Sequence, residues 1–402
     1  MTAQLLSRQQ LVQKAIAHVG YYNLHPDVSL NFQFNRWIQW LGEASVLEEM
    51  QTVAPKIKTY ADLRHEFLAL SEQALHQRRP LPAAYYLRTA EFFVWADDPQ
   101  KHLMRDRFVQ MMRQCYGITE NEQHQIPYQT GFLPAYRFTP QQPKATLVLF
   151  GGYDSYIEEF FPVAFFFVEA GYEVVIFEGP GQGGALEDAG LPMVANWEQP
   201  VTTVLDYFVL TDVILMGISL GGGLVIRAAA FEPRVQYVIA DDVLCDSLEV
   251  LLRSLPISLK ALVKQYLAEQ AADQLNALFD ALMPQSSILD WGIRQGMHIM
   301  GTTTPYEFLQ ATQTYNTIEI SDRITADVLL LAGSEDHYVP LPQLYRQAEA
   351  LTNARSLTTR VFTRAEQAQN HVHVGNLGLS LRFITNWLDY MIQKRKYCLT
   401  SL

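Results

Sequence analysis

The chain has 402 residues, of which 49 % are hydrophobic and 18 % are charged, so it can form a large buried core and is neither disordered nor fibrous. Its 30 Lys and Arg residues against 42 Asp and Glu residues give a net charge of −12, which argues against binding to nucleic acid or to an anionic membrane through the overall field. The length predicts about two to three domains, or one large α/β domain with an insertion.

Residues 1–124 are predicted to form an N-terminal helical domain. Apolar residues recur there at helical spacing: Leu63, Phe67, Leu70 and Leu75 in one stretch, and Phe92, Phe93 and Trp95 in the next. The breaker Pro80-Leu81-Pro82 separates these stretches. Asp98 followed by Pro99 predicts the N-cap and first turn of a further helix through Met112.

From residue 125 onward the pattern alternates between strand and helix. Short apolar runs predict strands at 126–130, 135–139, 145–150, 172–177, 213–216, 235–240, 328–332 and 357–362, the first two as an antiparallel pair around a turn at 131–134. Helices are predicted at 156–170, at 220–230 and in the segment that ends at Trp387. This alternation predicts the α/β class, with a mostly parallel eight-stranded sheet covered by helices on both faces.

The alternation of strands and helices is interrupted at residues 247–318 and ends before residue 396. Leucine-rich helical spacing at 247–318 predicts a cap insertion of two or three helices, in which Thr304-Pro305-Tyr306-Glu307 is a helix-start signal. The α/β core is therefore predicted at 125–246 and 319–395, followed by a short polar tail at 396–402.

The strongest chemical signal is Gly217-Ile218-Ser219-Leu220-Gly221, which directly follows a predicted strand and precedes a predicted helix. The glycines allow a sharp turn that projects the Ser219 hydroxyl from the edge of the sheet. Because a serine hydroxyl is a poor nucleophile at neutral pH, it needs a base, and the base needs an acid that orients it. The alternative is a tight turn with an inert serine.

The acid and the base are expected after Ser219 in the chain, in that order. Asp336 follows a predicted strand and is the candidate acid, with Glu335 as the rival whose side chain should point the other way. The loop after the last strand offers His371 and His373, and we favour His371 as the base. No third ligand is evident beside these histidines, so no metal site is predicted.

An oxyanion hole needs backbone N–H groups aimed at the developing negative charge. We assign these to Leu220, at the start of the helix, and to Tyr153, in the loop after the 145–150 strand. The alternative for Gly151-Gly152 is that these glycines only permit close packing.

A second glycine-rich run, Gly179-x-Gly181-x-Gly183, superficially resembles a dinucleotide-binding loop. Pro180 lies in its middle and no helix follows at once, so we interpret it as a structural turn near the mouth of the active site.

Four motifs together resemble the α/β-hydrolase superfamily over residues 125–395, and within it a subgroup with an N-terminal helical domain. They are Phe150-Gly151-Gly152-Tyr153-Asp154 with Glu158-Glu159, Phe177-Glu178-Gly179-Pro180-Gly181-Gln182-Gly183, Gly217-Ile218-Ser219-Leu220-Gly221-Gly222 and Thr304-Pro305-Tyr306-Glu307-Phe308. The subgroup includes 2,6-dihydroxypseudooxynicotine hydrolase, fungal polyketide-shortening hydrolases and acylaminoacyl-peptidase-like proteins. Alignment of Ala368 and Asn376 with its histidine motif supports His371, although the neighbouring residues differ.

The sequence therefore predicts a serine hydrolase with the catalytic residues Ser219, Asp336 and His371 and no cofactor. The resemblance implies cleavage of an ester, an amide or a C–C bond beside a ketone in a small molecule. Candidate pocket residues in the cap are Trp291, Met297, His298, Met300 and Tyr306. The alternatives are a peptidase-like hydrolase, an acyltransferase and a non-catalytic interaction protein built on the same fold. The sequence does not decide whether the chain forms a homodimer.

The expected location is cytoplasmic. The segment Met1–Gly20 has no apolar stretch of signal-peptide length, and the most apolar runs, Leu147–Phe150 and Phe165–Val168, are too short to cross a bilayer. The three cysteines, Cys115, Cys245 and Cys398, are too few and too scattered for a disulfide framework or a zinc cluster, which favours a reducing compartment.

Overall fold

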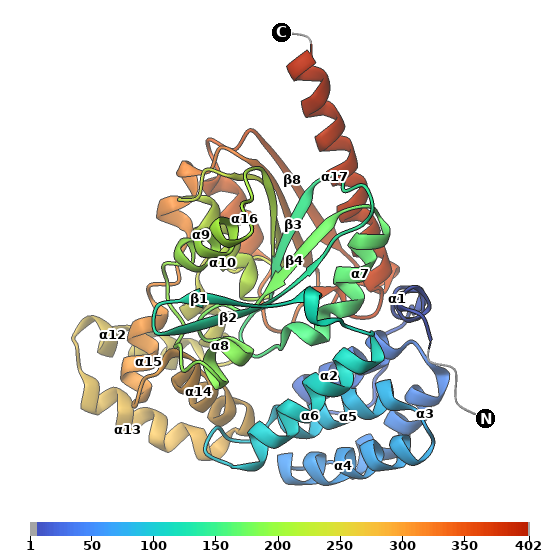
Figure 1. Ribbon diagram of the computed structural model, residues 1–402. Coiled ribbons are helices and arrows are strands. Elements are labelled where there is room, and N and C mark those ends of the chain that lie inside the picture. Colours follow the sequence, from blue (N-terminus) through green and yellow to red (C-terminus); the bar gives the residue numbers. More distant parts are fainter. Residues whose placement is uncertain (1–5, 401–402) are drawn as a thin grey trace.

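A computed structural model describes residues 6–400 and places a central sheet between layers of helices (Figure 1). Within the described residues the sheet has eight strands in the order β1-β2-β4-β3-β5-β6-β7-β8. Strands β1 and β2 are antiparallel to each other, β2 is antiparallel to β4, and the remaining neighbours are parallel. This confirms the mostly parallel eight-stranded sheet of the sequence prediction. The strands are β1 (Gln123–Tyr128), β2 (Gly131–Phe138), β3 (Thr146–Phe150), β4 (Glu173–Phe177), β5 (Val213–Ile218), β6 (Val235–Asp241), β7 (Asp327–Gly333) and β8 (Ser356–Phe362).

The hairpin that begins the sheet differs from the prediction. Its turn is not at 131–134 but at Gln129-Thr130, since Tyr128 pairs with Gly131 across the two strands. Gln129 adopts a left-handed backbone with φ of +48°, which allows so short a connection. Gly131 and Pro134 consequently lie inside β2.

The N-terminal helices share one buried core cluster with one face of the sheet. They are α1 (Arg8–Ala17), α2 (Val28–Leu41), α3 (Ala44–Val53), α4 (Tyr60–His76), α5 (Pro80–Phe92) and α6 (Gln100–Cys115). Helix α4 ends before Pro80, as predicted, and Pro80 itself opens α5, as the fixed φ of proline permits at a first helical position. Side chains from these helices, such as Trp37 and Phe67, belong to the same buried cluster as Leu147 of β3 and Met216 of β5.

The other face of the sheet has its own buried cluster. Side chains alternate along a strand, so Leu147 and Leu149 face the first cluster whereas Val148 and Phe150 face the second. The helices that connect or follow the strands are α7 (Phe161–Glu169), α8 (Gly183–Glu187), α9 (Glu198–Tyr207), α10 (Gly221–Ala229), α16 (Pro342–Ala350) and α17 (Leu377–Thr400). Helix α17 continues through most of the predicted polar tail and leads away from the body of the molecule (Figure 1).

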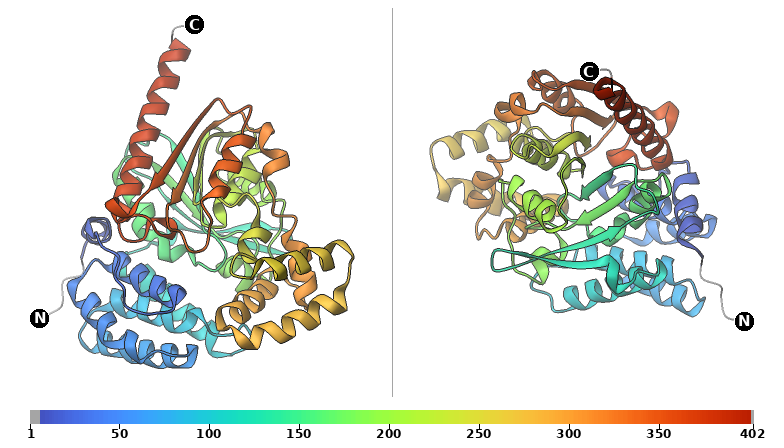
Figure 2. Two further views of the ribbon diagram at one scale, coloured as in Figure 1. Left: turned by 180° about the vertical axis from the view of Figure 1, so that it is seen from behind. Right: turned by 45° about the horizontal axis from the view of Figure 1, so that its top comes forward.

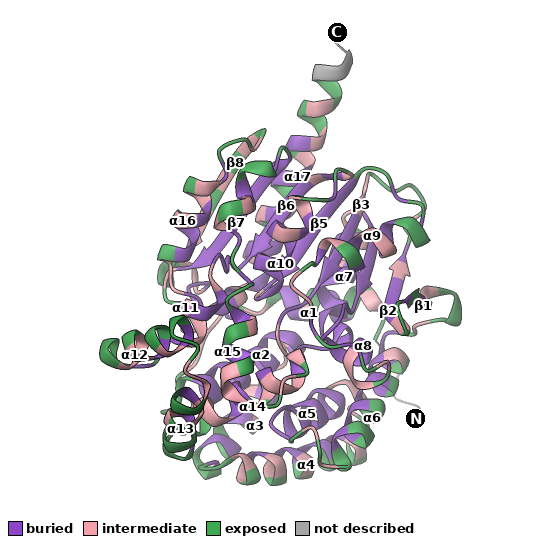
Figure 3. Ribbon diagram, turned by 90° about the vertical axis from the view of Figure 1, so that its left-hand side faces the viewer, coloured by how far each residue is buried: buried purple, intermediate pink, exposed green. Residues whose placement is uncertain are grey.

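The cap contains more helices than expected. Its segments within residues 6–400 are α11 (Ser247–Leu251), α12 (Ile257–Ala268), α13 (Ala272–Leu282), α14 (Ser287–Met300) and α15 (Pro305–Thr312). Figure 2 shows the cap beside the N-terminal helices at one end of the sheet. Strands β3 to β7 are almost entirely buried, whereas the buried residues of α12 are only Val263 and Leu267 and those of α13 only Leu275 and Phe279 (Figure 3). Helices of the described region lack the combined length and apolar character needed to span a membrane.

Candidate active site

Ser219 occupies a sharp turn between β5 and α10. Its φ of +61° lies in the left-handed region, and its N–H donates to the carbonyl oxygen of Asp241 over 2.6 Å. A Cβ atom on Gly217 would lie 1.9 Å from the carbonyl oxygen of Gly221, and one on Gly221 would lie 2.6 Å from that of Gly151. Both positions therefore require glycine, and the turn presents the serine hydroxyl at the carboxyl edge of the sheet.

The imidazole of His371 lies between the hydroxyl of Ser219 and the carboxylate of Asp336. His371 Nε2 is 2.8 Å from Ser219 Oγ, and His371 Nδ1 is 2.7 Å from Asp336 Oδ2. These side chains come from the segments that follow β5, β8 and β7. The structure thus brings the three predicted residues into one chain of hydrogen bonds along which a proton can move.

The rival residues are engaged elsewhere. His373 is fully buried, with Nε2 2.8 Å from Asp241 Oδ1 and Nδ1 3.3 Å from the carbonyl oxygen of Ala368. Glu335 is exposed and pairs with Arg364 on the surface.

A second carboxylate, which the sequence analysis did not single out, also faces His371. Asp242 Oδ2 lies 3.0 Å from His371 Nδ1 and accepts a hydrogen bond of 2.8 Å from the N–H of Val372. Asp242 is completely buried, and this burial, reinforced by the charge of Asp336, raises the pKa of Asp242. The sequence could have indicated Asp242, because Asp241 and Asp242 stand at the carboxyl end of β6, on the edge of the sheet where Ser219 lies.

The two carboxylates control the protonation of His371. Burial alone would lower the pKa of His371, but Asp336 and Asp242 outweigh that effect and raise the pKa to about 10. Burial likewise favours the neutral form of Asp336, but His371 outweighs it and lowers the pKa of Asp336. Opposite charges in hydrogen-bond contact favour each other's ionised form.

Replacing Asp242 with asparagine is expected to lower the pKa of His371 by on the order of 1 unit, because one of the two negative charges beside the imidazole is removed. The pH dependence of the imidazole ¹⁵N resonances measures this pKa, and His371→Gln identifies the signal. Asp241→Asn, one residue away and paired with His373, serves as the control and should leave the His371 signal almost unmoved. An unchanged midpoint in Asp242→Asn would contradict the contact of this carboxylate with His371.

The loop after β3 packs directly on the Ser219 turn. A Cβ atom on Gly152 would lie 3.0 Å from Ser219 Cβ and 2.9 Å from the backbone nitrogen of Leu220. Neither Leu220 nor Tyr153 donates its backbone N–H to an acceptor within residues 6–400. The Tyr153 hydroxyl donates to the carbonyl oxygen of Gly292 in α14 over 2.8 Å, which ties this loop to the cap.

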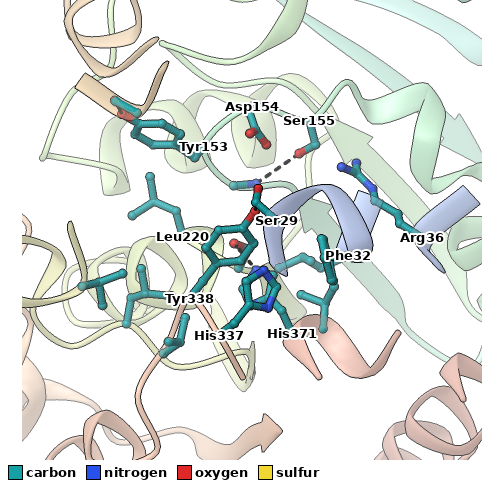
Figure 4. Close-up of a pocket in the computed structure, with 18 of the residues that line it drawn as sticks. Ser29, Phe32, Arg36, Tyr153, Asp154, Ser155, Leu220, His337, Tyr338 and His371 are labelled. Carbon is teal, nitrogen blue, oxygen red and sulfur yellow. Dashed lines mark hydrogen bonds between the residues drawn. The ribbon is translucent and has the colours of Figure 1, made fainter. Parts of the chain in front are cut away.

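Ser219 and His371 open onto a cavity of about 720 Å³ between the sheet, the N-terminal helices and the cap. Figure 4 shows Phe32 of α2 and Tyr338 beside His371, with ring centroids 5.8 Å and 5.0 Å from its ring. Arg36 of α2 and Tyr153 line the cavity farther from His371. Burial, together with the positive charges of His371 and Arg253, lowers the pKa of His337 to about 3, so this cavity-lining imidazole stays neutral.

The cap supplies only part of the predicted pocket. Trp291 and Met300 line the cavity, but Met297, His298 and Tyr306 do not. His298 Nε2 lies 2.9 Å from Glu187 Oε1, since α14 runs from the cavity towards α8. Met297 and Tyr306 pack into the apolar cluster inside the cap.

A buried network of charges, which was not predicted from the sequence, reaches the cavity through Arg36 and Asp154. Arg36 and Arg88 both bind Glu159, and Arg88 also donates to the carbonyl oxygen of Asp154 over 2.5 Å. The side chain of Asp154 faces the cavity, where burial raises its pKa although Arg36 and Arg88 oppose that shift. Arg36 and Arg88 lie far from this loop in the sequence, so no local motif links them to the site.

In the part of the chain that the structure describes, two groups of residues have the chemistry of metal ligands: Asp241, Asp242 and His373, and Asp242, Asp336 and His371. In the second group both ring nitrogens of His371 already contact Ser219 and the carboxylates. This group is arranged for proton transfer along hydrogen bonds.

A sequence profile described as the alpha/beta hydrolase family matches residues 147–374, which is more than half of the chain. Hydrolyase poxO of Penicillium oxalicum is 26 % identical over 361 residues, covering 80 % of this chain and 85 % of that protein. Hydrolase acrC of Aspergillus aculeatus is 27 % identical over 297 residues, covering 64 % of this chain and 67 % of that protein.

Among solved structures, 2,6-dihydroxy-pseudo-oxynicotine hydrolase matches with a TM-score of 0.58 at 21 % identity, covering 85 % of this chain and 91 % of that one. At that identity the match supports the fold. The profile match confirms the family, and these relatives support the subgroup to which the sequence motifs pointed.

Proposed function

The chain belongs to the alpha/beta hydrolase family and is a hydrolase, and on this premise we propose that Ser219 is its nucleophile and that it cleaves a small-molecule acyl compound. The observation that carries the proposal is the unbroken contact from Ser219 Oγ through His371 to Asp336, which opens onto a cavity large enough for a small organic substrate. A hydroxyl in this setting has both a base and an orienting acid.

In the proposed reaction, Ser219 Oγ attacks the carbonyl carbon while His371 Nε2 takes the hydroxyl proton. His371 then gives this proton to the leaving group, and the acyl group remains on Ser219 as an ester. Water, deprotonated by His371, attacks that ester and releases the acid. Because the unprotonated imidazole is the reactive form, the fraction of active enzyme increases with pH up to about the pKa of His371.

The backbone N–H groups of Leu220 and Tyr153 stabilise the negative oxygen of each tetrahedral intermediate. Support comes from their place beside Ser219 and from the lack of another acceptor for either group within the described residues. Such donors act mainly on the transition state, in which the charge develops.

The cavity favours a substrate that is largely apolar and carries a few polar groups. Its walls include Phe32, Trp291 and Leu251, and its polar positions include Arg36 and Asp154. The bond cleaved is an ester, an amide or a C–C bond beside a ketone. Turnover of p-nitrophenyl esters, amides and β-diketones distinguishes these three.

A fluorophosphonate probe tests the serine assignment. Covalent labelling of Ser219, located by peptide mass spectrometry and absent after mild heat denaturation, is the expected result. A folded chain without labelling would support a non-catalytic interaction protein and contradict the proposal. Transfer of the acyl group to added alcohols or amines in preference to water would identify an acyltransferase.

A further inference from the structure

Gln182 lies in the Glu178-Gly179-Pro180-Gly181-Gln182-Gly183 stretch that follows β4, and only 3 % of its surface is exposed. It does not line the cavity. Its side-chain nitrogen Nε2 donates to the carbonyl oxygens of Gly151 and Gly152, over 2.8 Å and 3.0 Å. This glutamine therefore holds the loop that leads from β3 to Tyr153.

The side-chain amide of Gln182 has one orientation that satisfies its surroundings. Its oxygen Oε1 accepts a hydrogen bond of 3.0 Å from the N–H of Gly179, while both Nε2 hydrogens point at carbonyl oxygens. A flipped amide would set its NH₂ group against the Gly179 N–H and its oxygen against two carbonyl oxygens. The donors of Gln182 are thus directed at Gly151 and Gly152.

These bonds also set the direction of the next N–H group. The peptide bond between Gly152 and Tyr153 is trans, so its C=O and N–H point in opposite directions. With the Gly152 oxygen held by Gln182, the Tyr153 N–H points away from Gln182. The other side of this loop is occupied by the Ser219 turn, against which Gly152 packs.

We propose that Gln182 is a positioning residue for the oxyanion hole, because it fixes the peptide plane that presents the Tyr153 N–H to the substrate oxygen. This inference rests on the proposed function of Ser219. It gives the glycine-rich stretch a role in the reaction, beyond that of a turn near the active-site mouth.

The surrounding stretch is built to keep Gln182 in place. Glu178 accepts hydrogen bonds from the N–H groups of Ile157 and Gly184, over 3.1 Å and 2.5 Å. A Cβ atom on Gly179 would lie 2.4 Å from the ring of Trp197, so the backbone passes too close to that ring for any other residue. Both ends of the turn that carries Gln182 are therefore anchored.

Gln182→Leu tests the proposal because it keeps much of the side-chain volume but removes the donors. We expect kcat for a p-nitrophenyl ester to fall about 10- to 100-fold, with KM changed less than about threefold, as for a misdirected oxyanion donor. The affinity for a boronic acid, which forms a tetrahedral anion on serine, should fall by a similar factor. The control is Gln347→Leu, at another fully buried glutamine that bonds Thr317 and Ser321, and it should leave kcat unchanged.

Gln182→Glu provides a second test, the pH dependence of kcat, which is informative even if Gln182→Leu does not fold. A protonated glutamic acid can donate one hydrogen bond to a carbonyl oxygen, whereas the carboxylate donates none and repels both oxygens. The ratio of variant to wild-type kcat should therefore increase as the pH falls. Comparing the two enzymes at each pH cancels the titration of His371, which both contain.

The outcomes separate this inference from the function on which it rests. A wild-type chain without turnover or labelling overturns the proposed function and this inference with it. An active wild type with kcat for Gln182→Leu within threefold of it, or with an effect on KM alone, overturns only the role of Gln182. A pH-independent ratio for Gln182→Glu does the same.

Discussion

Replacing Ser219 with alanine is expected to lower kcat for any substrate of the wild-type chain by on the order of 10⁵- to 10⁶-fold. The alanine has no oxygen to form the acyl-enzyme, and His371 loses the group from which it takes a proton. Any residual rate would come from water held beside the remaining oxyanion donors. Steady-state hydrolysis, together with loss of fluorophosphonate labelling, measures the effect.

A matched control separates loss of chemistry from loss of fold. Ser71 is a buried serine in α4, far from Ser219 in the sequence. Its hydroxyl donates to the carbonyl oxygen of Ala83 in α5. Ser71→Ala should cost about 1 kcal/mol of stability and leave kcat unchanged. If Ser219→Ala retained a tenth or more of the wild-type kcat, the nucleophile would be another group.

Replacing His371 with alanine should reduce kcat nearly as much as removing Ser219, because the two side chains act as one unit. Without the imidazole, no other side chain within residues 6–400 is hydrogen-bonded to Ser219 Oγ to take its proton, and the leaving group receives none. Chymotrypsin-like triads in general lose most of their rate when any member is removed. The measurement is kcat on the best ester found for the wild type.

His373→Ala is the informative comparison, since this histidine is two residues away. Its imidazole pairs with Asp241 and is entirely buried, so the change should lower the melting temperature. The folded fraction should nevertheless keep kcat within about tenfold of the wild type, because His371 still reaches Ser219. An inactive His373→Ala beside an active His371→Ala would reverse the assignment of the base.

Residues whose role follows from local context could be predicted from the sequence. Ser219, Asp336 and His371 each follow a strand at the carboxyl edge of a parallel sheet, and short apolar runs mark those strands. Their order along the chain then indicates that Ser219 is the nucleophile, Asp336 the acid and His371 the base. Asp242 has the same context directly after β6, but it was not among the predicted site residues.

Contacts between distant segments could not be predicted in this way. Gln182 meets Gly151 and Gly152 across about thirty residues, and Arg36 meets Glu159 across more than a hundred. No periodicity or spacing encodes such a pairing. The fold shows how the first pairing holds the loop beside Ser219 and how the second joins α2 to the helical turn Ile157–Phe160 that follows β3.

The predicted helices and turns that the structure corrects are those for which local residue preference was a poor guide. Gly131 and Pro134 have turn propensity, but pairing with β1 and the short Gln129-Thr130 connection outweigh it. In the cap, α12 and α13 are separated at Gln270, which has a left-handed backbone. Because this position is not a glycine, nothing in the sequence indicated the break between the two helices. At the other end of the chain, no proline or glycine stops α17 before the predicted tail.

Helix α2 has consequences for how this enzyme can change its substrate. Residues 29–41 are all buried: Trp37 and Ile38 hold the core together, whereas Phe32 and Arg36 face the cavity. A mutation there that reshapes the cavity therefore also risks the stability of the whole protein. The outer faces of α12 and α13 are free of this conflict, so substitutions are tolerated most readily there. A change of substrate preference made through α2 is subject to a tight stability constraint.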